Sequence, residues 1–222
     1  MNTRQQYILK ALVEEYIAEG DPISSGFLAH AYRHWDISPA TIRNELLVLD
    51  GEGFLDQPHT SSGRVPTAKG YRFFVDNLLE ESELEEKERE TIDNIKTFFE
   101  LSDFLAKESH SVVLGGRRLE EVYEAGLDYL LLEPEFDDAA FLRDFVSEVE
   151  KLRREHAKIL AFMNSKPHLY IGDEAKDIVD DERFSLLLTQ VKGEGFALFF
   201  SSTRMNYEKS IALANYLSGD HE

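Results

Sequence analysis

The chain has 222 residues, of which 42% are hydrophobic and 30% charged, a composition typical of a globular protein with one large or two small domains. It contains no cysteine, which excludes disulfides, thiolate metal sites and cysteine nucleophiles. No apolar run reaches the ~20 residues of a membrane-spanning helix, and the N-terminus lacks the apolar core of a signal peptide. These features favour a cytoplasmic protein without a membrane partner.

The net charge of −19 argues against a general nucleic-acid binder, but the charge is unevenly distributed. Residues 1–75 carry 7 Lys and Arg against 9 Asp and Glu, whereas residues 76–222 carry 17 against 34. This asymmetry suits a small DNA-binding module joined to a domain that does not contact phosphate.

Apolar residues at helical spacing predict helices over residues 3–19 and 25–34, separated by the helix-stopping Gly20-Asp21-Pro22. The third helix has the clearest start, because Ser38 is a good N-cap and Pro39 suits the first helical position. Its helical spacing predicts a core-facing side and an outward side. The core-facing residues are Ile42, Leu46 and Leu49, and the outward ones are Thr41, Arg43, Asn44 and Glu45.

Two short extended pieces, residues 54–57 and 64–66, flank a stretch rich in turn formers and predict a small hairpin. Thr67 can cap a fourth helix that carries Tyr71 and Phe74. Three helices followed by a hairpin are the layout of a winged helix-turn-helix, which we assign to residues 1–79.

The acidic stretch 80–90 predicts a solvated linker or the exposed start of a helix, and a connecting helix follows up to residue 108. Residues 109–222 mix strands and helices, so the fold class is α+β with a mixed or antiparallel sheet. Gly115-Gly116-Arg117-Arg118 favours a turn. The expected strands are 111–114, 127–132, 168–171, 184–191 and 196–200, and the expected helices are 141–162 and 207–217.

The outward side of the third helix carries side chains of the types that can contact DNA bases. Arg43 can contact guanine through two hydrogen bonds, and Asn44 can contact adenine in the same way. Thr41 and Ala40 can pack on a thymine methyl group or touch phosphate.

Phosphate contacts are expected from two helix starts and from the hairpin. Ser38 at the start of the third helix and Ser25, with Ser24, at the start of the second can bind the DNA backbone. In the hairpin loop, we expect contacts with a phosphate ridge or the minor groove, with Arg64 as the charged probe. The loop residues concerned are His59, Thr60, Ser61 and Arg64.

Other interpretations of these patterns stay open. The third helix is also compatible with an ordinary surface helix, and a winged helix can serve protein–protein contact. The α+β domain can sense a metabolite, with Arg204 as its best polar candidate and a structural salt bridge as the alternative role. His30 and His34 lie four residues apart without an evident third ligand, so we predict no metal site. We also predict no catalytic residues, no cofactor and no enzyme activity.

Three runs of sequence resemble signatures of the HrcA family of heat-shock repressors, in the family's order and spacing. They are Ser38 to Glu45, Gln57 to Thr67 and Gly70 to Asp76. The likeness covers residues 1–80 almost without a gap. It is patchier in residues 109–222, where Leu132 to Phe136, Ile171 to Glu174 and Thr203 to Tyr207 are similar to motifs of the family's GAF-like domain.

The resemblance implies a homodimeric repressor of chaperone operons that binds an inverted-repeat operator, named CIRCE, in double-stranded DNA. It also implies a chaperonin partner that helps the repressor reach its DNA-binding form. Two departures from the family are visible. The stretch between Leu114 and Leu127 is short where the family has the rest of its GAF-like sheet and an inserted dimerisation domain, so the GAF-like domain is expected to be reduced. Gly26 stands where the family often has a lysine.

Overall fold

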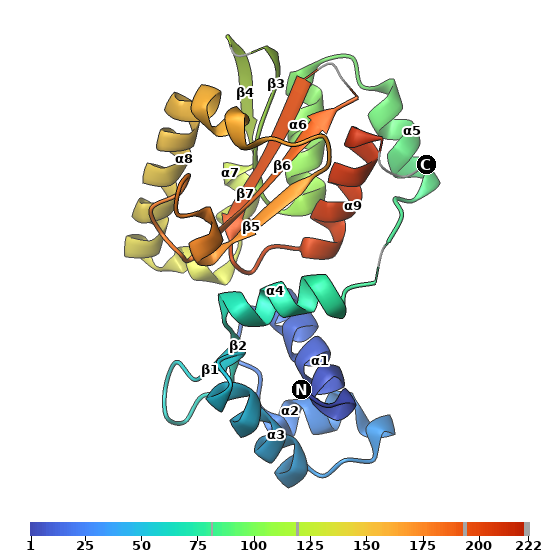
Figure 1. The fold of residues 1–222 in the computed structure, drawn as a ribbon, viewed down its shortest axis with the longest axis vertical. Coiled ribbons are helices and arrows are strands. Elements are labelled where there is room, and N and C mark those ends of the chain that lie inside the picture. Colours follow the sequence, from blue (N-terminus) through green and yellow to red (C-terminus); the bar gives the residue numbers. More distant parts are fainter. Residues whose placement is uncertain (81, 119, 193–194, 220–222) are drawn as a thin grey trace. The chain divides into compact units, whose positions relative to one another are not determined.

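A computed structural model describes residues 1–80, 82–118, 120–192 and 195–219 of the chain. The chain divides into two compact units, residues 1–79 and residues 80–222. We describe each unit by itself (Figure 1).

The first unit contains helices followed by a small hairpin and a further helix. Its two short strands pair antiparallel, with Leu55 opposite Pro66 and Asp56 opposite Val65. In chain order the elements are α1 (Thr3–Glu19), α2 (Ser25–Ala31), η1 (Arg33–Trp35), α3 (Pro39–Gly51), β1 (Leu55–Asp56), β2 (Val65–Pro66) and α4 (Ala68–Asn77).

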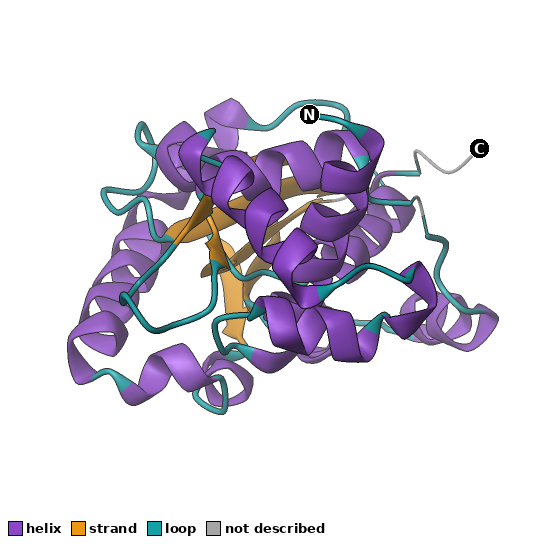
Figure 2. Cartoon of the chain, turned by 90° about the horizontal axis from the view of Figure 1, so that it is seen from below, coloured by secondary structure: helices purple, strands orange, loops and turns teal. Residues whose placement is uncertain are grey.

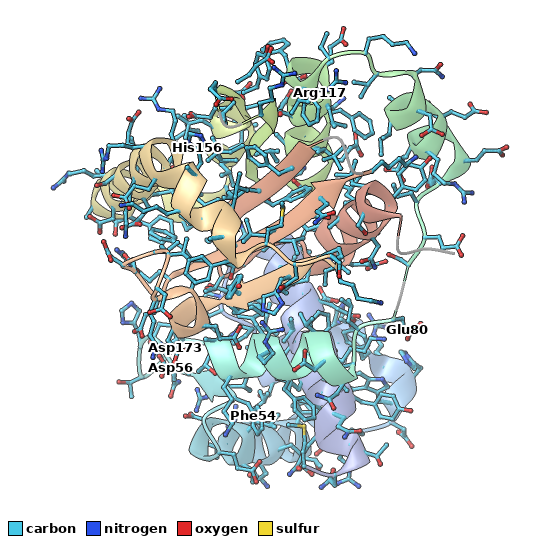
Figure 3. The ribbon with its side chains drawn as sticks, turned by 45° about the horizontal axis from the view of Figure 1, so that its top comes forward. Phe54, Asp56, Glu80, Arg117, His156 and Asp173 are labelled. Carbon is cyan, nitrogen blue, oxygen red and sulfur yellow. The ribbon has the colours of Figure 1, made fainter. Side chains whose placement is uncertain are left out.

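The core of this unit forms where the apolar stripes of its helices meet. Side chains from α1, α2, α3, β1 and α4 are almost fully buried there, as the helical spacing predicts. Phe54 lies against α4 (Figure 3), with its ring 5.4 Å from that of Phe73 and beneath the Lys69 ammonium at 4.3 Å. These contacts fix α4 against the start of the hairpin. The buried residues include Ile8, Leu12, Leu28, Ile42, Leu49, Leu55, Tyr71 and Phe74.

The second unit is a five-stranded sheet with helices packed on it. In chain order its elements are α5 (Glu86–Asn94), α6 (Phe98–Ser109), β3 (Val112–Arg118), β4 (Glu121–Ala125), α7 (Leu127–Leu130), η2 (Pro134–Asp137), α8 (Ala139–Ile159), η3 (Leu160–Phe162), β5 (His168–Ile171), η4 (Gly172–Ala175), β6 (Phe184–Val191), β7 (Gly195–Ser202) and α9 (Tyr207–Ser218).

The strand order is β4-β3-β7-β6-β5, and every neighbouring pair is antiparallel. Helices lie on both sides of the strands (Figure 2). Alternate residues of β6 point to opposite faces, as the pleat requires. Leu186 joins the cluster around Phe145 of α8, whereas Thr189 donates to the carbonyl oxygen of Ala214 in α9 at 3.0 Å. Both faces of the sheet are therefore covered, which explains the long apolar runs of the central strands.

The structure confirms most of the expected elements of this unit and corrects four. Residues 127–132 are not a strand: Leu127–Leu130 is the helix α7, which follows Gly126 at a left-handed φ of 103°. The connecting helix is two helices, because the backbone is extended at Ile95 and Thr97 caps a new helix, α6. Residues 121–125 form an unexpected edge strand.

The fourth correction concerns the glycine pair expected to form a turn, because Gly115 and Gly116 lie inside β3. A Cβ at Gly115 would stand 2.6 Å from the Ser102 hydroxyl oxygen, and one at Gly116 would stand 2.2 Å from the carbonyl oxygen of Glu121. Glycine is therefore needed here for close packing against α6 and β4 rather than for a turn.

Arg204 has the structural role that the sequence left as one of two alternatives. Its side chain is 7% exposed and forms ion pairs with Glu133 and Glu135, the latter at 2.7 Å. Within the described residues, no group of three or more His, Asp or Glu could hold a metal ion. Among the same residues, no helix combines the length and apolar character needed to cross a membrane.

Candidate nucleic-acid interface

The helix α3 is fixed by its cap and by its buried side. The Ser38 hydroxyl oxygen accepts a hydrogen bond from the backbone N–H of Thr41 at 3.1 Å, and Pro39 occupies the first turn. Ile42, Leu46 and Leu49 are buried against the core. The opposite side of α3 therefore has a defined orientation toward the surface.

On that surface the polar side chains differ in how freely they can bind a partner. Arg43 and Asn44 are exposed, and within the described part of the chain neither side chain has a hydrogen bond or ion pair. Ala40 is also exposed. The Thr41 hydroxyl lies 3.0 Å from the Ser38 hydroxyl and is half-buried. Arg43 and Asn44 thus keep their full hydrogen-bonding capacity for a partner molecule.

Glu45 does not point outward with Arg43 and Asn44, contrary to the prediction from helical spacing. Its carboxylate accepts a hydrogen bond from the Gln5 side-chain amide at 3.0 Å and lies 3.3 Å from the Arg4 guanidinium. This pairing with α1 removes a negative charge from the outward side of α3. A carboxylate there would have repelled phosphate.

The loop of the β1–β2 hairpin is held by its own side chains. The Gln57 amide donates to the carbonyl oxygens of Thr60 and Ser62, at 3.1 and 2.9 Å. The Ser62 hydroxyl accepts from the His59 N–H at 3.0 Å and donates to the His59 carbonyl oxygen at 2.7 Å. As a result His59, Thr60 and Ser61 form an ordered, exposed tip.

The loop is also attached to the segment before α2. The Arg64 N–H donates to the Ile23 carbonyl oxygen at 2.8 Å, and the Ile23 N–H donates to the Arg64 carbonyl oxygen at 2.9 Å. Gly63 permits this approach, because a Cβ there would lie 2.4 Å from the carbonyl carbon of Ile23. The hairpin therefore has a fixed position relative to α2 and α3.

Arg64 is not the charged probe at the tip that the sequence suggests. Its side chain is only 11% exposed, and its Nε lies 2.9 Å from Oδ2 of Asp50 at the end of α3. The contact is ionic, because Nε has no hydrogen-bond partner of acceptable geometry among the described residues. Arg64 thus positions the hairpin on α3.

Ser25 is also less accessible than the sequence suggests. Ser24 is the residue that caps α2, since its hydroxyl oxygen accepts from the Phe27 N–H at 3.0 Å. Ser25 occupies the first helical position and its side chain is buried. Of the two serines, only Ser24 is exposed to a phosphate group.

These elements enclose a concave surface of about 340 Å³, which we call the α3 hollow. It lies between the start of α2, the outward side of α3 and the hairpin loop. The sequence-predicted residues Ser25, Arg43, Thr60, Ser61 and Arg64 all line it, whereas Ser38, Ala40, Thr41, Asn44 and His59 do not. The complete lining is Ile23, Ser24, Ser25, Arg43, Leu46, Leu47, Gln57, Thr60, Ser61, Ser62, Gly63 and Arg64.

Sequence reasoning missed Leu47, an apolar residue on the polar side of α3. Its side chain is 52% exposed and lines the α3 hollow, one helical turn after Arg43. The signal was present, because residues four apart on a helix share a face. Leu47 lies four residues after the exposed Arg43, whereas the buried Leu46 lies four residues after the buried Ile42. Leu47 is therefore expected on the exposed face.

Comparison with known proteins finds no family model that matches the chain. Several curated proteins do match, all described as heat-inducible transcription repressor HrcA. The one from Bifidobacterium animalis subsp. lactis is 53% identical over 91 residues, which are 41% of this chain and 25% of that protein. The one from Natranaerobius thermophilus is 53% identical over 79 residues, or 36% of this chain and 23% of that protein.

A third relative, from Nitrosomonas eutropha, is 48% identical over 94 residues, covering 42% of this chain and 28% of its own. The matches therefore span about a quarter of each relative's length. Among solved structures, one described as a hypothetical protein shares the fold, with a TM-score of 0.74 and 19% identity over 99% of this chain and 96% of its own. Over a segment of about two fifths of its length, the chain is similar to the HrcA heat-inducible transcription repressors.

Proposed function

We propose that the chain is a sequence-specific DNA-binding repressor of heat-shock, or chaperone, operons. In this proposal residues 1–79 are a winged helix DNA-binding domain, residues 80–108 a linker and connecting helix, and residues 109–222 a reduced GAF-like domain. The relatives' description as heat-inducible transcription repressors supports the proposal.

The observation that carries the proposal is the state of Arg43 and Asn44 on α3. Both side chains are exposed and without a hydrogen-bond partner or counter-ion among the described residues, on a helix whose other side is buried. An arginine in this state can donate two hydrogen bonds to O6 and N7 of guanine, and an asparagine can pair with N6 and N7 of adenine. Arg43 also lines the α3 hollow, a concave surface that we propose to face the DNA.

The tip of the hairpin suits backbone contact rather than base contact. Thr60 and Ser61 have short hydroxyl side chains and His59 a ring that can donate a hydrogen bond to phosphate. Arg64 is paired with Asp50 and so holds the hairpin loop against α3. Of the two arginines that line the α3 hollow, Arg64 is paired with Asp50, which leaves Arg43 as the cation available to DNA there. We therefore expect modest non-specific affinity and specificity that depends on base contacts.

We further propose that two copies of the chain bind an inverted-repeat operator, since a two-fold symmetric site requires a symmetric pair of DNA-binding units. A chaperonin as a partner is also part of this proposal and is implied by the resemblance to the HrcA family.

Selection of bound sequences from a random pool of double-stranded DNA, with the full chain as bait, tests the function directly. We expect enrichment of one motif arranged as an inverted repeat. Enrichment that is equally strong with Arg43→Ala, or no enrichment over a bait-free control, would contradict the proposal. Arg72→Ala, which removes an arginine from α4 outside the α3 hollow, is the matched control and should enrich the parental motif.

A further inference from the structure

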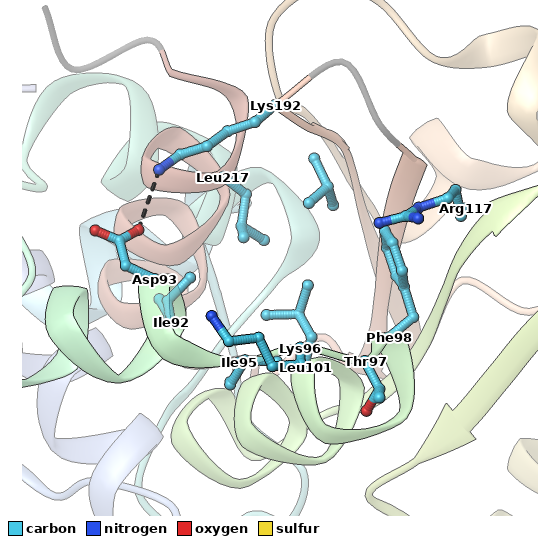
Figure 4. A pocket seen from close by; sticks show the side chains of 11 residues that line it. Ile92, Asp93, Ile95, Lys96, Thr97, Phe98, Leu101, Arg117, Lys192 and Leu217 are labelled. Carbon is cyan, nitrogen blue, oxygen red and sulfur yellow. Dashed lines mark hydrogen bonds and ion pairs between the residues drawn. The ribbon is translucent and has the colours of Figure 1, made fainter.

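The second unit contains a pocket of about 270 Å³ between the α5–α6 junction and one end of the sheet, which we call the α5–α6 pocket (Figure 4). All of its lining residues belong to the second unit. They are Ile92, Asp93, Ile95, Lys96, Thr97, Phe98, Leu101, Arg117, Val191, Lys192 and Leu217.

The apolar wall of this pocket depends on Phe98 and on a glycine of the sheet. A Cβ at Gly195 in β7 would stand 2.6 Å from the ring of Phe98, so the missing side chain leaves the space that the ring occupies. Ile92, Leu101 and Leu217 extend the wall around the cavity. Ile92, Leu101 and Leu217 are already buried, so the apolar surface left open to water belongs mainly to the half-buried Phe98 and Ile95. Covering that surface with an apolar group is favourable.

Three cations surround this wall, although acidic residues outnumber basic ones by 34 to 17 in residues 76–222. The Lys192 ammonium is balanced by Asp93 at 3.2 Å and lies over the Tyr216 ring at 4.6 Å. The Arg117 guanidinium lies over the Phe98 ring at 6.0 Å. Lys96 extends its ammonium into the pocket (Figure 4) and, among the described residues, has no ion pair. Among the described residues that line the pocket, three side chains are therefore cationic and one is anionic.

We propose that the α5–α6 pocket binds a small carboxylate with a short apolar chain. Lys96 would pair with the carboxylate from one side and Arg117 would approach it from the other, while the apolar chain of the ligand would cover Phe98 and Ile95. The volume lies just below the ~300–1,000 Å³ of pockets for drug-sized ligands, so the ligand is small. Inorganic phosphate could pair with the cationic side chains but would leave the apolar surface of the pocket exposed to water.

Isothermal titration calorimetry of the full chain with acetate, butyrate and hexanoate tests the proposal. We expect binding to tighten by about fourfold for each methylene that enters the pocket. Hexanol has the apolar chain without the negative charge, and inorganic phosphate has the charge without the chain. Both should bind far more weakly than hexanoate. Equal affinity for hexanoate and hexanol, or no hexanoate binding up to about 10 mM, would overturn the proposal.

Charge variants on α6 and its preceding turn complete the test. Lys96→Gln should weaken hexanoate binding about tenfold or more, because an ion pair in a partly apolar site is lost. Lys107→Gln, an exposed change near the other end of α6, should leave hexanoate binding unchanged. Hexanoate binding that Lys96→Gln leaves intact would contradict the assigned site.

A second inference concerns DNA and rests on the proposed function. Leu47 and Val48 are neighbouring exposed apolar residues of α3, 52% and 43% exposed, but only Leu47 lines the α3 hollow beside Arg43. The C5-methyl group of thymine is the apolar group on the major-groove edges of the bases. We infer that Leu47 contacts a thymine methyl next to the base that Arg43 contacts, and so contributes to sequence preference.

Replacing single thymines of the selected operator by deoxyuridine removes one methyl group at a time. We expect the parent chain to lose affinity about fourfold at one such position in each half-site, the effect of one buried methyl-sized group. Leu47→Ala should bind thymine and deoxyuridine at that position equally, whereas Val48→Ala should keep the parental difference. Discrimination that persists in Leu47→Ala overturns this inference alone, whereas absence of DNA binding by the parent overturns the proposed function as well.

Discussion

The Nε atom of Arg64 lies 2.9 Å from Oδ2 of Asp50, so the last residue before β2 is joined by an ion pair to the final turn of α3. The side chain of Arg64 is 11% exposed and that of Asp50 33% exposed. This pair and the backbone bridge between Arg64 and Ile23 hold the hairpin beside the residues that we propose to contact bases. Arg64 therefore affects DNA binding through geometry and not through its own charge.

Arg64→Ala should lower the free energy of unfolding of the first unit by about 1–2 kcal/mol, between the values for exposed and buried ion pairs. Urea unfolding followed by tryptophan fluorescence measures this, because Trp35 is the single tryptophan of the chain and belongs to the first unit. DNA binding should weaken, while the slope of log K against log salt stays at the parental value.

A reduced salt slope in Arg64→Ala would show instead that Arg64 neutralises a phosphate, and would contradict the positioning role. Arg43→Ala is the control for stability. Since Arg43 has no hydrogen bond or ion pair in the described structure, this variant should unfold at the parental urea concentration.

Arg43→Ala should leave stability unchanged and alter DNA recognition, the reverse of Arg64→Ala, because the Arg43 guanidinium is available to the DNA. We expect a loss of about 1–3 kcal/mol in binding to the selected operator and a relaxed preference at one base pair of each half-site. Competition gel shifts with operators changed at single positions measure both effects. If the variant and the parent ranked these operators in the same order, with the same ratios of affinity between them, Arg43 would have no role in base recognition.

The elements that the sequence predicted well are those whose signals are local. The start of α3 follows from Ser38 and Pro39 alone, and its buried side follows from the spacing of Ile42, Leu46 and Leu49. The strand His168–Ile171 was likewise predicted at its observed bounds. Such signals operate within one helical turn or one strand, so no knowledge of the rest of the fold is required.

The errors arise where the spacing of apolar residues does not decide the structure. The apolar run after Gly126 fits a buried strand or a helix equally well, and the left-handed glycine before it begins a helix. Glu45 has the spacing of an outward residue, but Gln5 and Arg4, forty residues earlier, draw it toward α1. Arg64 has the position of an exposed loop residue, but its ion pair with Asp50 holds it against α3. Ion-pair partners of this kind cannot be read from spacing.

The close approach of Gly63 to the chain before α2 gives a third prediction. Gly63→Ala should destabilise the first unit by about 1–3 kcal/mol, because the added Cβ would stand 2.5 Å from the carbonyl oxygens of both Ile23 and Pro22. Gly51→Ala is the matched control, since nothing lies within 4 Å of a Cβ at the end of α3.

The control variant should unfold at the parental urea concentration or be more stable by at most about 1 kcal/mol. DNA binding should fall with Gly63→Ala and not with Gly51→Ala. Equal stability of the two variants, measured by Trp35 fluorescence, would mean that the hairpin does not depend on its contact with Ile23.

The fourth prediction concerns pH and the ion pairs of Arg204. Burial raises the pKa of Glu133, but hydrogen bonds from His110 and Arg204 outweigh it and hold that pKa below the ordinary value. A lowered native pKa stabilises the fold where the unfolded carboxyl is ionised, above about pH 4.3. The contribution shrinks as the pH falls below that value and is absent below the native pKa.

Glu133→Gln should therefore reduce the unfolding free energy at pH 7 and have a smaller effect at pH about 3, where the parent also loses the charge. Urea unfolding followed by far-ultraviolet circular dichroism at both pH values measures the difference between variant and parent. Glu182→Gln, an exposed carboxylate without a partner among the described residues, controls for general charge effects and should differ little from the parent at either pH. A destabilisation by Glu133→Gln that is equal at the two pH values would show that the lost interaction does not depend on the carboxylate charge. The bonds from Arg204 and His110 would then contribute nothing through ionisation.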